Sequence, residues 1–227
     1  MKDRGQKTGT QFLAGLAIGL MLAVSRRIGE NSLRARGKAP ENLFGMGKNM
    51  GHSLRGQTLG LLGCGRIGKR TAEIAAALGM RCIGYSRHGV NHPQVESVTL
   101  PELLAQSDVL SLHCPLTQET RRLLDRSALA RMKQGSILIN TARGAIVDCD
   151  ALADALESGH LRGAGLDVYP DEPHIPPRLI ALPQVVLTPH IGTNTQETRQ
   201  RMAEECARQI ADALAGKRPA YVVNGIE

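Results

Sequence analysis

The strongest indication of the fold is the stretch Thr58-Leu59-Gly60-Leu61-Leu62-Gly63-Cys64-Gly65-Arg66-Ile67-Gly68. An apolar run typical of a buried strand leads directly into a glycine turn of the form G-x-G-x-x-G, and a helical pattern follows over 66–78. Gly63, Gly65 and Gly68 permit a tight turn and a close approach to a pyrophosphate, which binds at the positive N-terminus of the helix. The turn therefore predicts a dinucleotide site; the alternative is a glycine turn that only packs helix on strand.

Strand and helix signals alternate along the rest of the chain. Further strands are expected over 81–85, 109–113, 136–140, 163–168 and 185–187, and further helices over 99–105, 125–132, 150–157 and 195–214. This alternation predicts an α/β fold with a doubly wound parallel sheet. Ahead of the glycine turn, we expect a buried apolar helix over 10–28 and an irregular connection over 31–52.

Arg143, Glu172 and His190 each follow a short apolar run. Ligands of doubly wound sheets bind beyond the carboxyl ends of the strands, so we expect these side chains to converge. Arg143 could bind the carboxylate of a 2-oxo acid, and His190 could protonate its carbonyl oxygen while Glu172 stabilises the imidazolium. Taken singly, they could equally be a surface ion pair, a loop charge and a turn histidine.

The end of the second strand indicates which dinucleotide binds. NAD sites usually place a carboxylate here for the ribose 2′-hydroxyl, but no Asp or Glu follows until Glu96. Ser86 and Arg87 instead offer a hydroxyl and a guanidinium suited to a 2′-phosphate. The sequence therefore favours NADP(H), with NAD(H) as the alternative.

Composition excludes several classes of partner. The formal net charge of +7 is spread along 227 residues without a basic run, and aromatic residues make up only 2%, which argues against nucleic-acid binding. The five cysteines and seven histidines follow no metal-ligand spacing, so we expect no metal site. The apolar stretch 12–24 imitates a signal peptide but is shorter than the about 20 residues that cross a bilayer. A buried helix of a cytoplasmic protein, without membrane contact, is expected.

Four segments besides the glycine turn carry a resemblance to a known family: 113–117 (HCPLT), 139–147 (INTARGAIV), 164–168 (AGLDV) and 188–192 (TPHIG). With them the chain resembles the D-isomer-specific 2-hydroxyacid dehydrogenases, which include D-3-phosphoglycerate dehydrogenase and the glyoxylate and hydroxypyruvate reductases. The resemblance extends from Thr10 to Asn224. It implies hydride transfer between a nicotinamide cofactor and a small 2-oxo or 2-hydroxy acid.

The resemblance also implies roles for individual residues. Arg143 would bind the substrate carboxylate, His190 would donate the proton and Glu172 would be its acidic partner. Arg66 and Ile67 would lie at the pyrophosphate, and Ser86 and Arg87 at the adenosine ribose. The remaining positions expected along the cofactor, chiefly on its nicotinamide side, are Cys114, Pro115, Thr141, Ala142, Asp167 and Gly192.

The resemblance predicts three parts of the chain: a linking and dimerisation helix (1–30), the dinucleotide-binding domain (31–192) and a C-terminal helix that returns to the substrate domain (193–227). Family members carry a further flavodoxin-like half-domain ahead of the point where this chain starts, so an incomplete substrate domain is expected. A homodimer is expected because the apolar helix over 10–28 needs a cover, from its own fold or from a partner. The alternatives to an NADP(H)-linked reductase are an NAD-dependent D-3-phosphoglycerate or other D-2-hydroxyacid dehydrogenase, and a nucleotide-binding protein with little turnover.

Overall fold

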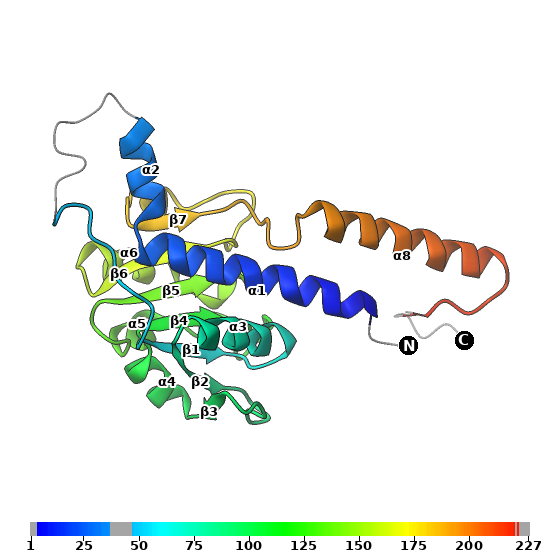
Figure 1. Cartoon of the computed structure of the whole chain (residues 1–227), viewed down its shortest axis with the longest axis horizontal. Helices are drawn as coiled ribbons and strands as arrows, with labels where there is room; N and C mark the ends of the chain where they lie inside the picture. Colours follow the sequence, from blue (N-terminus) through cyan, green and yellow to red (C-terminus); the bar gives the residue numbers. More distant parts are fainter. Residues whose placement is uncertain (1–3, 37–46, 221, 223–227) are drawn as a thin grey trace.

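The structure is a computed structural model, and it describes residues 4–36, 47–220 and 222 (Figure 1). A sheet of seven parallel strands forms its centre, in the spatial order β3-β2-β1-β4-β5-β6-β7. This arrangement confirms the predicted doubly wound α/β fold. The strands are β1 (Thr58–Leu62), β2 (Arg81–Tyr85), β3 (Val95–Ser97), β4 (Val109–Leu112), β5 (Ser136–Asn140), β6 (Leu161–Leu166) and β7 (Val185–Leu187).

The strand order reverses between β1 and β4, which lie side by side at the centre of the sheet. From β1 the chain builds outward to β2 and β3, then crosses back to β4 and builds in the other direction. The segments that follow β1 and β4 therefore lead in opposite directions along the sheet. Such a switch point is where parallel sheets bind their ligands.

Helices cover both faces of the sheet. One face carries α1 (Arg4–Ser25) and α3 (Arg66–Ala77), and the other carries α4 (Leu100–Gln106), α5 (Arg126–Ala130) and α6 (Cys149–Glu157). The short α7 (Pro177–Ile180) lies beside α6 and β7. The last helix, α8 (Gln196–Leu214), contacts α1 and otherwise projects away from the sheet (Figure 1).

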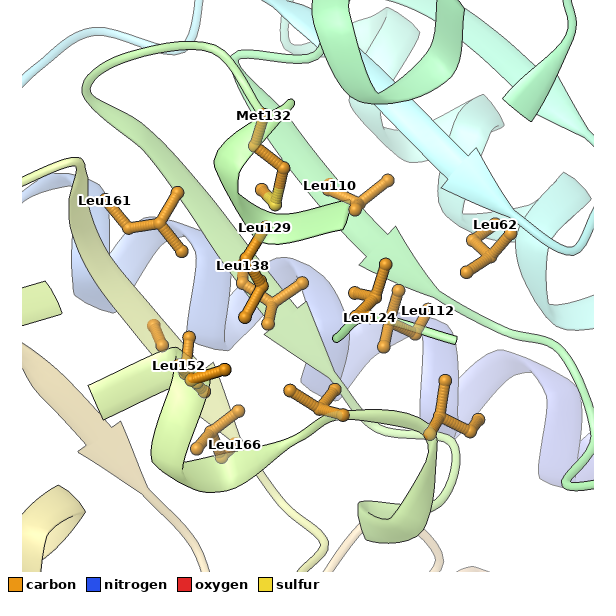
Figure 2. Close-up of a cluster of buried hydrophobic side chains, with 14 of the residues drawn as sticks. Leu62, Leu110, Leu112, Leu124, Leu129, Met132, Leu138, Leu152, Leu161 and Leu166 are labelled. Atoms are coloured by element: carbon orange, nitrogen blue, oxygen red, sulfur yellow. The ribbon is translucent and has the colours of Figure 1, made fainter. Parts of the chain in front are cut away.

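The core beneath α4, α5 and α6 consists mainly of leucine. In Figure 2, Leu110, Leu112 and Leu138 of the central strands lie in one buried cluster with Leu129 of α5 and Leu152 of α6. All five side chains are at most 1% exposed. Full burial of one such side chain stabilises a fold by about 1.5–3 kcal/mol, so this layer holds the strands chiefly through aliphatic side chains.

The core on the opposite face is built around α1. Ala17, Met21 and Val24 of this helix pack with Ile137 and Ile139 of β5 in one buried cluster. The buried stripe of the apolar N-terminal helix is therefore covered by the chain's own fold, which is one of the two alternatives expected for it. Within the described residues no single helix is long and apolar enough to span a membrane; α1 from Gln11 and α2, bent by 64° to each other, reach that length only together.

Local sequence signals place most helix starts. Thr99 and Glu102 form a capping box at α4, in which the Glu102 carboxylate accepts from the Thr99 N–H at 2.8 Å. Asp125 and Asp148 cap α5 and α6, and Thr195 caps α8. In each case a side-chain oxygen accepts a backbone N–H that the first turn leaves unpaired.

The predicted boundaries differ most from the structure in three segments. The helix expected over 10–28 ends at Ser25, because the chain adopts a left-handed conformation at Arg27 (φ 52°) and starts a second helix, α2 (Ile28–Arg36). The connection expected over 31–52 is therefore partly helical, and its residues 37–46 lie outside the described residues. Strand β6 begins two residues earlier than expected and ends at Leu166, because it pairs with β5 from Leu161 onward.

Three short elements were not predicted: β3, α7 and a 3₁₀ turn, η1 (Gly144–Ile146). Each has only three or four residues, which is too short for a hydrophobic period to be recognised. Strand β3 depends on its place beside β2, where Val95 pairs with Cys82. Tertiary context decides such segments more than their own sequence does.

Candidate active site

The glycine turn lies at the switch point, between β1 and α3. Gly63 has a φ of 97°, and a Cβ built there would come within 2.7 Å of the Cys114 backbone nitrogen. A Cβ at Gly68 would overlap the carbonyl oxygen of Gly63. Gly63 therefore allows the turn to pack closely against the loop that follows β4, and Gly68 allows α3 to pack closely against the turn.

Gly65 lies at the N-terminus of α3 and differs from the other two glycines. A Cβ built on it would meet no atom within 4 Å, and no side chain caps the first turn of the helix. The space beside it is therefore open, next to backbone N–H groups that favour an anion. At the carboxyl end of β5, the buried Thr141 hydroxyl has no hydrogen-bond partner among the residues that the structure describes. An open cradle at a helix N-terminus and an unpaired hydroxyl fit a dinucleotide lying across the switch point.

Arg143 lies on the loop that follows β5. The Asn140 side chain shapes this loop, because its amide oxygen accepts from the Ala142 N–H at 3.0 Å and its NH₂ donates to the Arg143 carbonyl at 3.0 Å. The Arg143 backbone is extended (φ −147°), and its guanidinium donates to the Ala142 carbonyl at 2.6 Å. The side chain is exposed at the surface of the site.

A close backbone contact brings this loop to the segment that follows β6. Gly144 is buried against the peptide between Tyr169 and Pro170, where any Cβ would overlap the backbone. Tyr169 in turn donates its phenol to the Thr188 carbonyl at 2.9 Å, and its N–H donates to Glu172 Oε1 at 3.0 Å. Gly144 and Tyr169 therefore bring the ends of three strands to one place.

The structure brings His190 and Glu172 into direct contact. Nδ1 of His190 lies 2.7 Å from Oε2 of Glu172. The His190 backbone is left-handed (φ 54°), a conformation uncommon for residues with a side chain and often found at functional sites. Half of the His190 side chain is exposed, so a small molecule can reach the ring.

A buried carboxylate holds the loop that carries His190. Asp167 is 0% exposed and accepts three hydrogen bonds: from the Thr188 hydroxyl at 2.6 Å, the Ile191 N–H at 2.8 Å and the Gly192 N–H at 2.9 Å. Gly192 is buried as well, and Leu13 of α1 fills the space where a side chain would lie. The structure thus places Asp167 and Gly192 beneath the His190 loop.

The charges around Glu172 keep it ionised. Burial acts to raise its pKa, but hydrogen bonds from His190 and the Tyr169 N–H and the positive charges of His190 and Arg143 together hold the pKa below its usual range. Arg143 is therefore close enough to act on Glu172 electrostatically. Of the three residues predicted from distant sequence segments, His190 and Glu172 are in direct contact and Arg143 acts on Glu172 through its charge.

Ser86 and Arg87 follow β2 at the other end of the candidate cofactor site, half-buried and exposed respectively. Glu96, the next carboxylate along the chain, pairs with Arg81 at 2.6 Å. Sequence reasoning missed Glu119, which comes from the loop after β4 and places its Oε2 3.9 Å from Nη1 of Arg87. No local signal could identify it, because 32 positions separate the two residues along the chain.

The other predicted cofactor residues lie around the glycine turn and the strand ends. Arg66 is exposed and Ile67 half-buried at the start of α3, while Cys114 and Ala142 are half-buried and Pro115 is exposed. Burial raises the pKa of the Cys114 thiol. Burial also lowers the pKa of the neighbouring His113 to about 4, so its ring, 2.9 Å from the Ser111 hydroxyl, is neutral at physiological pH.

Among the described residues no cluster of three His, Cys, Asp or Glu could hold a metal ion.

Comparison with known proteins gives a consistent relationship. Residues 18–192 match the NAD binding domain of the D-isomer specific 2-hydroxyacid dehydrogenases. Over 224 residues the chain is 43% identical to a glyoxylate reductase of Thermococcus litoralis, a match that covers 95% of this chain and 67% of that protein. It is 41% identical over 207 residues to a D-3-phosphoglycerate dehydrogenase of Mycobacterium leprae, covering 88% of this chain and 38% of the relative.

Solved structures agree. The crystal structure of the TT0316 protein from Thermus thermophilus superimposes with a TM-score of 0.90 at 47% identity, covering 94% of this chain and 68% of that one. The chain thus spans between 38% and 68% of the length of these three proteins. With the fold, the glycine turn and the family match in agreement, the chain belongs to the D-isomer-specific 2-hydroxyacid dehydrogenase family.

Proposed function

We propose that the chain carries the catalytic domain of an NADP(H)-linked reductase that converts a small 2-oxo acid, glyoxylate or hydroxypyruvate, to the 2-hydroxy acid. The observation that carries the proposal is the 2.7 Å contact between His190 and Glu172. A protein that only binds a nucleotide has no use for an ionised carboxylate that orients an exposed imidazole. Glyoxylate reductase is also the name of a relative with 43% identity.

Arg143 binds the substrate carboxylate in this proposal. Its guanidinium is exposed and carries a fork of donors that matches a carboxylate in two parallel hydrogen bonds. The adjacent carbonyl oxygen would then lie within reach of the same positive charge, which polarises the carbonyl bond. Lysine would offer a point charge without this planar geometry.

His190 supplies the proton. Its Nδ1 faces Glu172, which leaves Nε2 as the nitrogen directed to the substrate. Glu172 stabilises the positive ring before transfer and fixes its orientation, so Nε2–H donates to the carbonyl oxygen during reduction. In oxidation the same nitrogen accepts the hydroxyl proton. Loop geometry is maintained by Asp167, which holds the residues on both sides of His190.

When bound, the nicotinamide cofactor supplies the hydride for the carbonyl carbon. Gly65, Arg66 and Ile67 would hold its pyrophosphate, and Thr141 and Ala142 would line the nicotinamide side together with Cys114 and Pro115. Ser86 and Arg87 would hold the ribose phosphate of NADP(H). The preference for NADP(H) is supported by Glu96, the next carboxylate along the chain. It pairs with Arg81, so it is not free to accept from the ribose 2′-hydroxyl of NAD(H).

An NAD-dependent D-3-phosphoglycerate or other D-2-hydroxyacid dehydrogenase is the second candidate. The observation that favours it is Glu119, whose carboxylate lies near the position that the adenosine ribose would take. In an NAD site a carboxylate there accepts from the 2′-hydroxyl. The name of the Mycobacterium leprae relative belongs to this class of enzyme.

We also propose a cytoplasmic homodimer, in which residues 1–30 contribute to the interface and 193–227 return to the substrate domain. The five cysteines are all free thiols, as in a reducing compartment. Ile28 and Leu33 of α2 are 53% and 75% exposed, and a partner could cover them.

Light scattering should give twice the chain mass, because a dimer contains two copies of the chain. A monomer at micromolar concentration would exclude the dimer.

Replacement of His190 by alanine tests the assignment of the proton donor. We expect kcat for glyoxylate reduction to fall by about 10²–10⁴, because general acid catalysis contributes that much. Cofactor affinity should stay unchanged, since the ring is assigned to the substrate. Turnover followed by loss of NADPH absorbance, with Kd from fluorescence titration as control, measures both. Retained turnover would refute the role.

Replacement of Arg87 by alanine tests the cofactor preference. Hydrogen bonds to charged groups contribute about 1.5–3 kcal/mol, so the Kd of NADPH should rise roughly 10- to 100-fold. The Kd of NADH should change less than threefold, because NADH lacks the phosphate. Equal losses for both cofactors would contradict the proposed preference for NADP(H).

The pH behaviour of Glu172 tests the charge pair. A carboxyl whose pKa is lower in the folded than in the unfolded chain contributes stability above its ordinary pKa of about 4.3, and loses it as pH falls through the folded value. We expect the folded pKa of Glu172 to lie below its ordinary value and to rise in His190→Ala, where burial acts with less opposition. An NMR titration of the carboxyl carbon, assigned with Glu172→Gln, measures this. The same pKa in both proteins would disprove the coupling.

A further inference from the structure

Arg87 does not project freely into solvent. Its Nη1 lies 3.9 Å from Oε2 of Glu119, so a carboxylate lies beside the guanidinium that the proposed function assigns to the 2′-phosphate. The two residues come from different loops: Arg87 follows β2, and Glu119 follows β4. Because β2 and β4 flank β1, these loops leave the same carboxyl edge of the sheet, on either side of the loop after β1.

The Glu119 carboxylate is held in this position. The Thr117 hydroxyl donates to Oε2 at 2.6 Å, and Oε2 is also the atom nearest Arg87. This hydrogen bond, followed by smaller contributions that include the charge of Arg87, lowers the pKa of Glu119, so the group is ionised at neutral pH. The Thr117 hydroxyl lies 3.3 Å from that of Thr120, whose hydroxyl donates to the Pro115 carbonyl at 2.7 Å. A short network thus ties the carboxylate to the loop after β4.

Both partners remain accessible. The Arg87 side chain is 60% exposed and the Glu119 side chain 69%, so a ligand phosphate can approach either group. An exposed pair at this distance contributes little by itself and yields to a stronger anion. A phosphate carries more negative charge than the carboxylate and accepts several hydrogen bonds from one guanidinium.

We propose that Glu119 is a specificity-determining residue that competes with the 2′-phosphate for Arg87 and so limits the preference of the site for NADP(H) over NAD(H). The inference rests on the proposed function, because it assumes that Arg87 binds that phosphate. In the absence of cofactor, Glu119 neutralises the guanidinium. NADP(H) must displace the carboxylate, whereas NAD(H), which has no 2′-phosphate, leaves the pair intact.

The test is a double-mutant cycle on the full chain, with the Kd values of NADPH and NADH measured by fluorescence titration. In Glu119→Gln we expect the Kd of NADPH to fall roughly three- to tenfold, since the competing charge is removed while the shape is kept. The Kd of NADH should stay within twofold. In the Arg87→Ala background, the same change at Glu119 should alter the Kd of NADPH by less than twofold, because no guanidinium remains to compete for.

Glu204→Gln is the matched control: it removes one exposed carboxylate on α8, a helix assigned no contact with the cofactor, and should leave both Kd values unchanged. An equal gain in NADPH affinity with and without Arg87 would overturn the competition. Weaker NADH binding in Glu119→Gln would also overturn it, because Glu119 would then accept from the ribose hydroxyl of NAD. Failure of the proposed preference itself is recognised separately, by Arg87→Ala weakening both cofactors equally.

Discussion

The buried carboxylate of Asp167 is the constraint on which the candidate active site depends most. It lies just past the end of β6 and binds the residues on both sides of His190 through three hydrogen bonds. A buried carboxyl group needs such donors in place of water. They fix the backbone on both sides of His190, which is left-handed and keeps its ring 2.7 Å from Glu172. The chemistry of an exposed histidine therefore depends on a residue that solvent does not reach.

Close backbone contacts complete the assembly. Gly63 brings the loop after β1 against the loop after β4, and Gly144 brings the loop after β5 against the segment after β6. Each contact joins loops from neighbouring strands at the carboxyl edge of the sheet. The cradle beside Gly65 and the unit of Arg143, Glu172 and His190 thus lie at the same edge of one rigid scaffold.

Much of this architecture could be predicted because its signals are local. The glycine turn, the apolar strands and the caps at Thr99, Asp125 and Asp148 each depend on a few consecutive residues. The convergence of Arg143, Glu172 and His190 followed from one topological rule applied to predicted strand ends. The break at Arg27 and the short β3 were not predictable, because tertiary contacts decide them. Glu119 was not predicted because it lies near Arg87 across a strand, and spacing along the sequence does not indicate such a contact.

The most direct test of the account is to titrate the 227-residue chain with NADPH and NADH by fluorescence and then to add glyoxylate to the complex. We expect NADPH to bind more tightly than NADH and to be oxidised when glyoxylate is added. That result requires the open site at the N-terminus of α3 to hold the cofactor while the His190–Glu172 pair delivers the proton to the substrate. Failure to bind either dinucleotide, or tight binding of NADPH without oxidation by glyoxylate or hydroxypyruvate, would contradict it.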